Sequence, residues 1–312
     1  MNERRVTRGV VAPFWLDRPG EEAIGLAAAA ERFGYREFWV GEMLHFDAFA
    51  LAGAIAQSTH RITVTVGPLA IGLRDPVSLA MGVGSVETIG RRPARLAIGA
   101  SSRALVEGWH GRAHGGEAKR VEEAIGLIRS VLAGERTDHR GPSFSSIGFR
   151  SGLGKTTDHI TVAAAGDRMI AAAARSADRI VLNLVTPDRT GRVAKQSGLP
   201  VAVWVVAAVD PTPAAIDQIR RQLSLYLSVP GYQESLGEAG LDALVDKVRE
   251  GARPKDVAGL ITSEMISAIA AIGSSAEASA TVEAFEKTGA EVMLVPVTAD
   301  DEGGTRTLRE LA

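Results

Sequence analysis

Very small residues stand between a predicted strand and a predicted helix at residues 160–176. The stretch reads ITVAAAGDRMIAAAARS, so Ala164, Ala165 and Gly166 directly follow an apolar, β-branched run. Two interpretations fit this composition. The small residues either let the helix pack closely on a sheet, or they allow a ligand to approach the backbone. In the second case, the chemistry at this point is binding through main-chain groups rather than reaction at a side chain.

The residue types that usually carry metal, nucleophilic or acid–base chemistry are sparse elsewhere. Glu42, His45 and Asp47 follow another apolar run, but no second histidine or carboxylate pair lies at ligand spacing, so we expect no metal site. The chain has no cysteine, which excludes disulfides, thiolate ligands and thiol catalysis. It also has no Gly-x-Ser-x-Gly turn and no Walker loop. Small residues, hydroxyls and exposed backbone favour a site for a large, flat cofactor that performs the chemistry itself.

Composition and charge narrow the class of protein. Hydrophobic residues make up 46% and charged residues 23% of the 312 residues, as in ordinary soluble domains. The formal charge of −2 gives no overall basic field, so we expect neither a nucleic acid nor a membrane as partner. Pro13 and Asp17 interrupt the first apolar run, which is unlike a signal peptide. These features predict a soluble, cytoplasmic protein.

Short apolar runs alternate with longer amphipathic stretches along the chain. The predicted strands are nearly continuous in apolar residues, as is typical of strands buried on both faces of a parallel sheet. They cover residues 9–14, 37–42, 62–70, 95–100, 160–164, 178–185, 200–209 and 290–297. The predicted helices cover residues 21–33, 48–58, 75–89, 119–134, 167–176, 214–227 and 275–289. This alternation predicts an α/β fold, a single (β/α)8 TIM barrel that comprises residues 1–312 as one domain.

Two connections are much longer than the others, and we interpret them as insertions after strands 4 and 7. They cover residues 101–159 and 210–289, and the Gly/Ser-rich part at residues 141–158 is predicted to be loop. Active sites of such barrels are built from the loops that follow the strands. We therefore expect the two insertions to form walls of the site. A doubly wound sheet is the alternative fold, but it would need a glycine fingerprint after the first strand.

Four stretches occur in an order and spacing that together are fairly specific. They read GYREFWVGEMLHFD, VGPLAIGLRDPVSLA, LAIGASSRALVEGWHG and ITVAAAGDRMIAAAARSADRIVLNLVTP. In this the chain resembles the luciferase-like monooxygenase superfamily, and within it the coenzyme F420-dependent oxidoreductases. The resemblance covers residues 5–210 and the last third only through its final strand.

The resemblance implies a coenzyme whose ring lies across the mouth of the barrel. In the family a bulge with a non-prolyl cis peptide supports the ring, and the matching bond here is Val66–Gly67, although the Gly67–Pro68 bond would cost less in the cis form. Backbone groups at the end of strand 5 hold the phosphate, at a helix start that favours an anion. The implied cofactor-binding residues are Val66, Gly67, Pro68, Ala100, Ser101, Ser102, Ala164, Ala165, Gly166, Arg168, Asn183 and Thr186. Structural interpretations remain open, because serines often cap helices and asparagines often close turns.

Strand 2 departs from the pattern of the family. Deazaflavin-dependent dehydrogenases often have an acidic residue followed by a histidine there, whereas this chain has Glu42 followed by Met43. Glu42 and His45 are therefore the candidate catalytic residues, although a displacement of two residues is large for proton transfer. Trp15, Trp109 and His110 are the candidates for contact with the substrate.

The leading hypothesis is an oxidoreductase that transfers a hydride between coenzyme F420 and an unidentified small organic substrate. The second keeps the fold and changes the cofactor to FMN, in a luciferase-like monooxygenase that uses oxygen. The third is a non-catalytic protein that binds flavin or deazaflavin, and Met43 is the residue in its favour. Members of the family often form dimers, so we also expect a homodimer.

Overall fold

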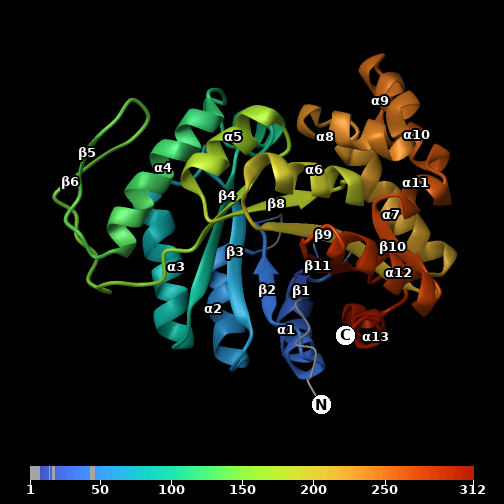
Figure 1. The fold of residues 1–312 in the computed structure, drawn as a ribbon, viewed down its shortest axis with the longest axis horizontal. Helices are drawn as coiled ribbons and strands as arrows, with labels where there is room; N and C mark the ends of the chain where they lie inside the picture. The colour runs from blue at the N-terminus through green and yellow to red at the C-terminus, as the bar shows by residue number, and fades with distance from the viewer. Residues whose placement is uncertain (1–7, 14, 16–17, 43–45) are drawn as a thin grey trace. The chain divides into compact units, whose positions relative to one another are not determined.

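A closed barrel of eight parallel strands, with helices between the strands, confirms the predicted (β/α)8 fold (Figure 1). This computed structural model describes residues 8–13, 15, 18–42 and 46–312. The barrel strands are β1 (Gly9–Val11), β2 (Glu37–Val40), β3 (Thr63–Ala70), β4 (Ala94–Gly99), β7 (Ile160–Ala163), β8 (Arg179–Asn183), β9 (Val201–Val209) and β11 (Glu291–Pro296). Hydrogen bonding follows the order β1-β2-β3-β4-β7-β8, β8 pairs with β9, and β9 pairs with β11, which returns to β1.

The chain divides into two compact units, which we describe separately. The central unit comprises Glu37–Val181 and Ser197–Leu199. The terminal unit comprises the residues up to Arg36 together with Leu182–Gln196 and Pro200–Ala312. The interpretation of the whole chain as one domain stays a prediction.

The helices of the central unit begin where the sequence provides caps. Asp75 accepts a hydrogen bond from the N–H of Ser78 at 2.9 Å and precedes Pro76, which is well suited to a first helical turn. Gly134 follows another helix with a φ of +75°, as is typical of a glycine at the end of a helix. The elements outside the barrel are α2 (Ala48–Ser58), α3 (Pro76–Gly90), the π-helix η1 (Ala104–Trp109), α4 (Glu117–Leu132), β5 (Asp138–Arg140), β6 (Ser145–Ile147) and α5 (Asp167–Ser176).

The predicted loop at residues 141–158 is wrong in part, because β6 lies within it and pairs with β5 as an antiparallel hairpin. Glu123 holds this hairpin from α4. Its carboxylate accepts hydrogen bonds from the N–H of Phe144 at 2.9 Å and of Ser143 at 3.1 Å, and it contacts His139 Nε2 at 3.0 Å. These partners are 16 to 21 residues away in the sequence, so local composition did not reveal them.

A buried polar cluster lies among the amino ends of the strands in the central unit. Arg179 donates two hydrogen bonds to Glu37, at 2.6 and 2.9 Å, and one to Thr161 at 3.2 Å. Arg95 and Thr65 also donate to Glu37. Burial alone would raise the pKa of Glu37, but the hydrogen bonds and charge of Arg179, with the charge of Arg95, outweigh it and lower that pKa below its ordinary value.

The terminal unit is built around β9, all nine of whose residues are buried. β11 pairs with it in parallel, from Glu291 opposite Ala202 to Pro296 opposite Ala207. The further elements of this unit are α1 (Glu22–Phe33), α6 (Pro187–Ser197), α7 (Pro213–Tyr226), α8 (Pro230–Leu236), the π-helix η2 (Gly237–Leu241), α9 (Asp242–Arg249), α10 (Pro254–Val257), η3 (Ala258–Leu260), α11 (Ser263–Ser267), β10 (Ala270–Gly273), α12 (Ser275–Glu286), η4 (Glu302–Gly304) and α13 (Thr305–Glu310).

The first and last described segments of the terminal unit are bound to each other. Arg8 donates to Glu286 at 2.8 Å and to the carbonyl oxygen of Leu311 at 2.7 Å. The hydroxyl of Tyr35 donates to the carbonyl oxygen of Leu308 at 2.8 Å. Since β1 also pairs with β11, both ends of the chain contribute to one side of the barrel wall.

Candidate functional site

The end of β3 contains the predicted bulge. The register between β3 and β4 shifts between Val66 and Leu69, and Gly67 adopts a φ of +121°. A Cβ at this glycine would lie 2.1 Å from the carbonyl oxygen of Ala97, so only glycine fits here without rearranging β4. The cis peptide is Gly67–Pro68 and not the predicted Val66–Gly67, because the bond before a proline has only a small preference for trans.

Two serines follow the end of β4. Ser101 is exposed and adopts a φ of +61°, which is uncommon for a residue other than glycine. Ser102 is half-buried, and its Oγ accepts a hydrogen bond from the N–H of Leu105 at 3.3 Å. Its carbonyl oxygen accepts from Val106 at 3.0 Å. Ser102 therefore supports the start of η1, while Ser101 and the half-buried Ala100 remain accessible.

The π-helix η1 carries two of the predicted substrate-contacting residues at its end. Trp109 is 62% exposed, and His110 directly after it is exposed as well. Glu107 is held within the helix by Arg103 at 3.1 Å. Short π-helical segments occur frequently at functional sites, and this one directly follows a barrel strand.

The small residues that follow β7 have unequal roles. The N–H of Ala164 donates to the carbonyl oxygen of Val181 at 3.3 Å, so it already belongs to the pairing of β7 with β8. Gly166 is the N-cap of α5, where no side chain caps the helix, and it is exposed like Arg168. Its φ of −113° suits any residue, and a Cβ built there would meet nothing within 4 Å. Packing among the described residues therefore does not require glycine at position 166.

Glu42 lies after β2 and is engaged in an ion pair. Arg74 donates to both carboxylate oxygens of Glu42 and also binds Asp47, and its guanidinium lies 5.4 Å from the centre of the Phe49 ring. Hydrogen bonds from Arg74 outweigh the effect of burial and lower the pKa of Asp47, and the hydrogen bond with Glu42 raises the pKa of Arg74. This arrangement suits a positioning ion pair better than a proton donor. His45 lies outside the described residues.

In the terminal unit, Asn183 ends β8 and shares hydrogen bonds with two tyrosines. Tyr226 bonds with Gln222 and Asn183, and Tyr232 bonds with Asn183 as well. The two rings meet edge to face with their centroids 4.8 Å apart. Burial raises the pKa of both hydroxyls above the ordinary value, so both stay protonated at neutral pH.

Thr186, the second predicted contact of this unit, supports α6. Its Oγ1 accepts a hydrogen bond from the N–H of Arg189 at 3.2 Å, as a capping residue does. The hydroxyl proton is left to donate to another group.

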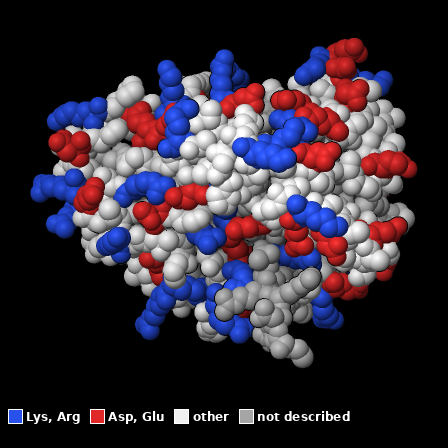
Figure 2. Space-filling model, viewed as in Figure 1, with Lys and Arg blue, Asp and Glu red and all other residues white. Residues whose placement is uncertain are grey.

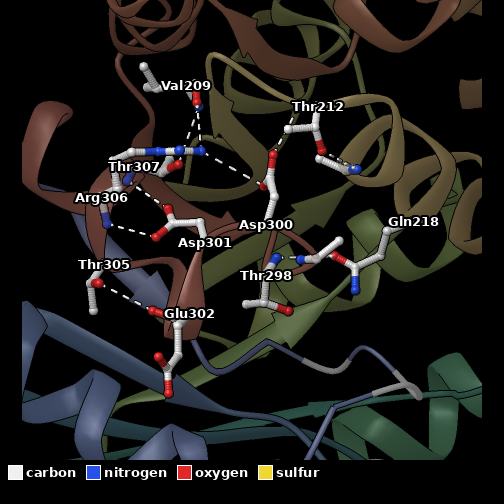
Figure 3. A network of polar contacts seen from close by, with 12 residues as sticks. Val209, Thr212, Gln218, Thr298, Asp300, Asp301, Glu302, Thr305, Arg306 and Thr307 are labelled. Carbon is white, nitrogen blue, oxygen red and sulfur yellow. Dashed lines mark hydrogen bonds and ion pairs between the residues drawn. The ribbon is translucent and has the colours of Figure 1, made fainter.

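Trp15 is buried and lines a cavity of about 510 Å³ in the terminal unit. Its indole N–H donates to the carbonyl oxygen of Pro296, the last residue of β11, at 2.8 Å. The Oε1 of Gln218 on α7 accepts from the N–H groups of Thr298 and Ala299, both at 3.1 Å (Figure 3). The cavity therefore lies at the carboxyl end of β11. Its other lining residues are Arg221, Gln222, Ser224, Leu225, Lys255 and Ala258.

A second group of polar contacts fixes the segment that follows β11 (Figure 3). Asp301 accepts from the N–H groups of Arg306 at 2.9 Å and Thr307 at 2.8 Å. The hydroxyl of Thr307 in turn accepts from the N–H of Val209, the last residue of β9, at 3.2 Å. The carboxyl ends of β9 and β11 are thus joined through side chains as well as through the strand pairing.

Sequence reasoning missed several residues that contribute to these ends. Arg74 is 32 residues from its partner Glu42 in the sequence, so no local pattern indicates the pair. Tyr226, Tyr232 and Gln218 lie in the part of the chain that resembles the family only through its last strand. The rarity of tyrosine, with three in the chain, was the one available signal.

On the face that Figure 2 shows, basic and acidic side chains are interspersed. Among the residues that the structure describes, no group of three or more His, Asp or Glu side chains is arranged to hold a metal ion. No helix within the described part of the chain is long and apolar enough to cross a membrane.

Comparisons with known proteins agree on one family and one fold. The family model named luciferase-like monooxygenase matches residues 7–291. A protein of Mycobacterium tuberculosis with the provisional name coenzyme F420-dependent oxidoreductase is 24% identical over 97% of both chains. The coenzyme F420-dependent tetrahydromethanopterin reductase of Methanopyrus kandleri has a TM-score of 0.80 at 18% identity, over 98% of this chain and 97% of that one. An F420-dependent secondary alcohol dehydrogenase, solved with an F420–acetone adduct, has a TM-score of 0.78 at 17% identity, over 99% and 98%.

Proposed function

Because the chain belongs to the luciferase-like monooxygenase family, we propose that it is an oxidoreductase in which coenzyme F420 and a small organic substrate exchange a hydride. The family is one of enzymes, which disfavours the hypothesis of a non-catalytic binding protein. Three similar proteins are named for F420, and they match nearly the whole of this chain. Their names are the reason to prefer the deazaflavin to a flavin.

The observation that carries the proposal is the uncapped start of α5. Gly166 is exposed there, and a side chain at this position would fill space that the described residues leave open. The positive end of the ten-residue helix favours an anion, while Asp167 and Arg168 in its first turn carry opposite charges, so the attraction rests on the backbone N–H groups. A phosphate therefore fits at Ala165 and Gly166. Ala164 and Ala165 would contribute their small size beside Gly166.

The remaining predicted contacts would position the ring and the tail. The residues Val66, Gly67, Pro68, Ala100, Ser101 and Ser102 would face the ring, and Asn183 and Thr186 would bind near the phosphate. When bound, the deazaflavin supplies the ring carbon that gives or accepts the hydride. The chain would then orient the substrate and exclude water. Catalysis by Glu42 and His45 stays a prediction, and the ion pair with Arg74 assigns Glu42 a positioning role first.

The test is coenzyme binding by the variant Gly166→Val. We expect the wild type to quench the fluorescence of coenzyme F420 at lower concentrations than that of FMN, and the variant to bind F420 at least about tenfold more weakly, since the new methyl groups would block the phosphate. Gly152→Val is the matched control, because a Cβ at Gly152 also meets nothing within 4 Å. Equal binding by the wild type and by Gly166→Val would contradict the phosphate site, provided that both variants melt at the temperature of the wild type.

An FMN-dependent monooxygenase is the second candidate function, favoured by the name of the matching family model. The same helix start would hold the phosphate of either coenzyme. Tighter binding of FMN than of F420, with oxygen consumed when the bound FMN is reduced, would establish this alternative. The homodimer and the cytoplasmic location stay predictions.

A further inference from the structure

A second cavity lies within the central unit, among segments that follow β3 and β4. Its volume is about 400 Å³, which is enough to hold part of a small organic molecule. Four segments surround it: the loop after β3, the loop after η1, the start of α4 and the turn of the β5–β6 hairpin. We call it the arginine cavity, and its lining residues are Gly72, Arg112, Ala113, Arg120, Pro142 and Ser143.

Arg120 is held in place by groups from all four segments. Its Nη1 donates to the carbonyl oxygen of Ala113 and to Glu117, both at 3.4 Å. Its guanidinium lies 5.7 Å from the centre of the Phe144 ring, and a Cβ at Gly72 would lie 3.9 Å from the same Nη1. The hydrogen bonds to described residues use Nη1 alone, so Nε and Nη2 remain as donors. The positive charge is thus preorganised, which lowers the cost of binding an anion.

Arg112 supplies a second positive charge to the lining. It is exposed, and within the described chain its guanidinium makes no hydrogen bond or ion pair. Its backbone is fixed, since its N–H donates to the carbonyl oxygen of Val106 at 3.0 Å. The exposed Ser143 adds a hydroxyl that can donate. Two guanidinium groups in one concave surface attract anions, and an arginine binds a carboxylate through two parallel hydrogen bonds.

Two carboxylates close to the arginine cavity are engaged with groups of the protein. Glu117 accepts from the N–H of Gly115 at 2.8 Å as well as from Arg120. Glu123 accepts from backbone N–H groups of the hairpin turn. These bonds compensate part of the negative charge of both carboxylates. Arg112, by contrast, has a charge that no described side chain pairs with.

η1 connects the arginine cavity to the proposed coenzyme site. The carbonyl oxygen of Ser102, after β4, accepts from the N–H of Val106, and the carbonyl oxygen of Val106 accepts from Arg112. Ser102 and Arg112 are thus two hydrogen-bonded turns apart, or about 10 Å along a helix. β4 in turn pairs with β7, which leads to Gly166. An elongated coenzyme whose phosphate lies at Gly166 can therefore extend along η1 towards the cavity.

We propose that the arginine cavity is a carboxylate-binding subsite, and that its ligand is the γ-linked oligoglutamate tail of coenzyme F420. The identity of this ligand rests on the proposed function. F420 carries carboxylates beyond its phosphate, whereas FMN ends at the phosphate. Arg112 and Arg120 would each pair with a carboxylate of the tail. The cavity would then distinguish the deazaflavin from the flavin by groups that only the deazaflavin has.

The experiment is a fluorescence titration of the full chain with F420, with the form of F420 that ends at its phospholactyl group, and with FMN. We expect the wild type to bind the tailed form at least about tenfold more tightly than the form without the tail. In Arg112→Glu, we expect the tailed form to bind at least about tenfold more weakly, because a carboxylate replaces the cation, and the other two coenzymes to bind as in the wild type. Since the side chain of Arg112 is exposed, the variant should melt at the wild-type temperature.

Arg36→Glu is the matched control, because it reverses the same charge at an exposed arginine outside the lining of the arginine cavity. We expect this control to bind all three coenzymes like the wild type. Arg112→Lys should retain most of the affinity for the tailed form, since it keeps the charge. Equal binding of the tailed and tail-less forms by the wild type, or equal weakening in the control, would overturn the proposal.

Two further outcomes distinguish this proposal from the proposed function. If Arg112→Glu binds the tailed and the tail-less form equally weakly, Arg112 binds the phosphate, and the assignment of the tail is wrong. Calorimetry with the dipeptide γ-glutamylglutamate tests the cavity without a coenzyme. If the wild type binds this dipeptide through Arg112 but binds neither F420 nor FMN, the proposed function fails, and the cavity is a subsite for free carboxylic acids instead of the tail.

Discussion

The two ends of the strands in the central unit have opposite character. At the amino ends, the buried side chains of Glu37, Thr65, Thr161 and Arg179 bind one another, and the partly exposed Arg95 also donates to Glu37. The ion pair of Glu37 with Arg179 is almost entirely buried, with 6% and 1% of the side chains exposed. Such a network needs all its members, because a single buried charge without its partner is strongly unfavourable.

The carboxyl ends of the same unit are conformationally unusual, and Ser101 and Gly166 are exposed there. Ser101 has a positive φ directly after β4, Gly67 bulges out of β3, and Gly166 begins α5 without a cap. The amino ends thus complete their interactions within the chain, whereas the carboxyl ends leave room for another molecule. This contrast accords with the general division of barrel enzymes into a stabilising end and a reactive end.

The largest effect is expected from a substitution in the buried network at the amino ends of the strands. Glu37→Leu leaves Arg179 buried without its carboxylate, so we expect the free energy of unfolding to fall by about 3–5 kcal/mol. In the double variant Glu37→Leu/Arg179→Met both charges are gone, and we expect it to recover most of that loss. Urea denaturation measures both. If the double variant is no more stable than Glu37→Leu, the loss of stability does not come from the unpaired charge of Arg179.

Gly67→Ala tests how much one glycine at the carboxyl ends of the strands contributes to stability, compared with the network at the amino ends. The new Cβ would collide with the carbonyl oxygen of Ala97, and alanine disfavours a φ of +121°. We expect a loss of about 2–4 kcal/mol in the free energy of unfolding. Gly166→Ala, where the Cβ meets nothing, is the matched control and should change stability by less than about 0.5 kcal/mol. Similar losses of stability in both variants would contradict the inference that a side chain collides at position 67 but not at position 166.

His159, beside the network at the amino ends, makes the stability of the protein depend on pH. Burial, followed by the charges of Arg95 and Arg179, lowers its pKa to about 4 despite the opposing charges of Asp178 and Glu37. The unfolded chain, with an ordinary histidine pKa near 6.5, binds the proton first, so stability falls as the pH drops from about 6.5 towards 4.

We expect this loss to be about 1–2 kcal/mol in the wild type, since His159 is only partly buried, and to be absent in His159→Gln. Urea denaturation at pH 7.5, 6 and 5 compares the two proteins. A parallel decline in both would assign the pH dependence to other groups.

The smallest effect is expected at Ser101, whose backbone is strained by a positive φ directly after β4. Ser101→Gly relieves the positive φ, so the free energy of unfolding should rise by up to about 1 kcal/mol. Ser102→Gly removes the hydroxyl that accepts from Leu105 and should lower it by about 0.3 kcal/mol. Thermal melts of the two variants should therefore shift in opposite directions.

Most of the fold was predictable because its determinants are local. The helix at 48–58 has its predicted bounds, and the helix predicted at 75–89 covers Pro76–Gly90. The helix α6 escaped prediction because only Arg189, Thr190 and Val193 of it are buried, which gives no apolar period.

The candidate site was predictable only in part, because its determinants are distant in sequence. Small residues at the ends of β4 and β7 could be identified, since residue type and order carry that signal. The engagement of Glu42 by Arg74 and the positive φ of Ser101 arise from the folded structure. The cavity on α7 belongs to the region that least resembles the family, so its lining could not be transferred from relatives.

The attachment of the chain's first segment to its last has a consequence for synthesis on the ribosome. β1 pairs with β11, and Arg8 and Tyr35 bind carbonyl oxygens of Leu311 and Leu308. None of these bonds can form until the residues up to Leu311 have left the exit tunnel, whereas nearly all of the central unit is translated without interruption much earlier. The nascent chain therefore holds β1 unpaired with β11 until β11 has emerged, and completes the barrel only then.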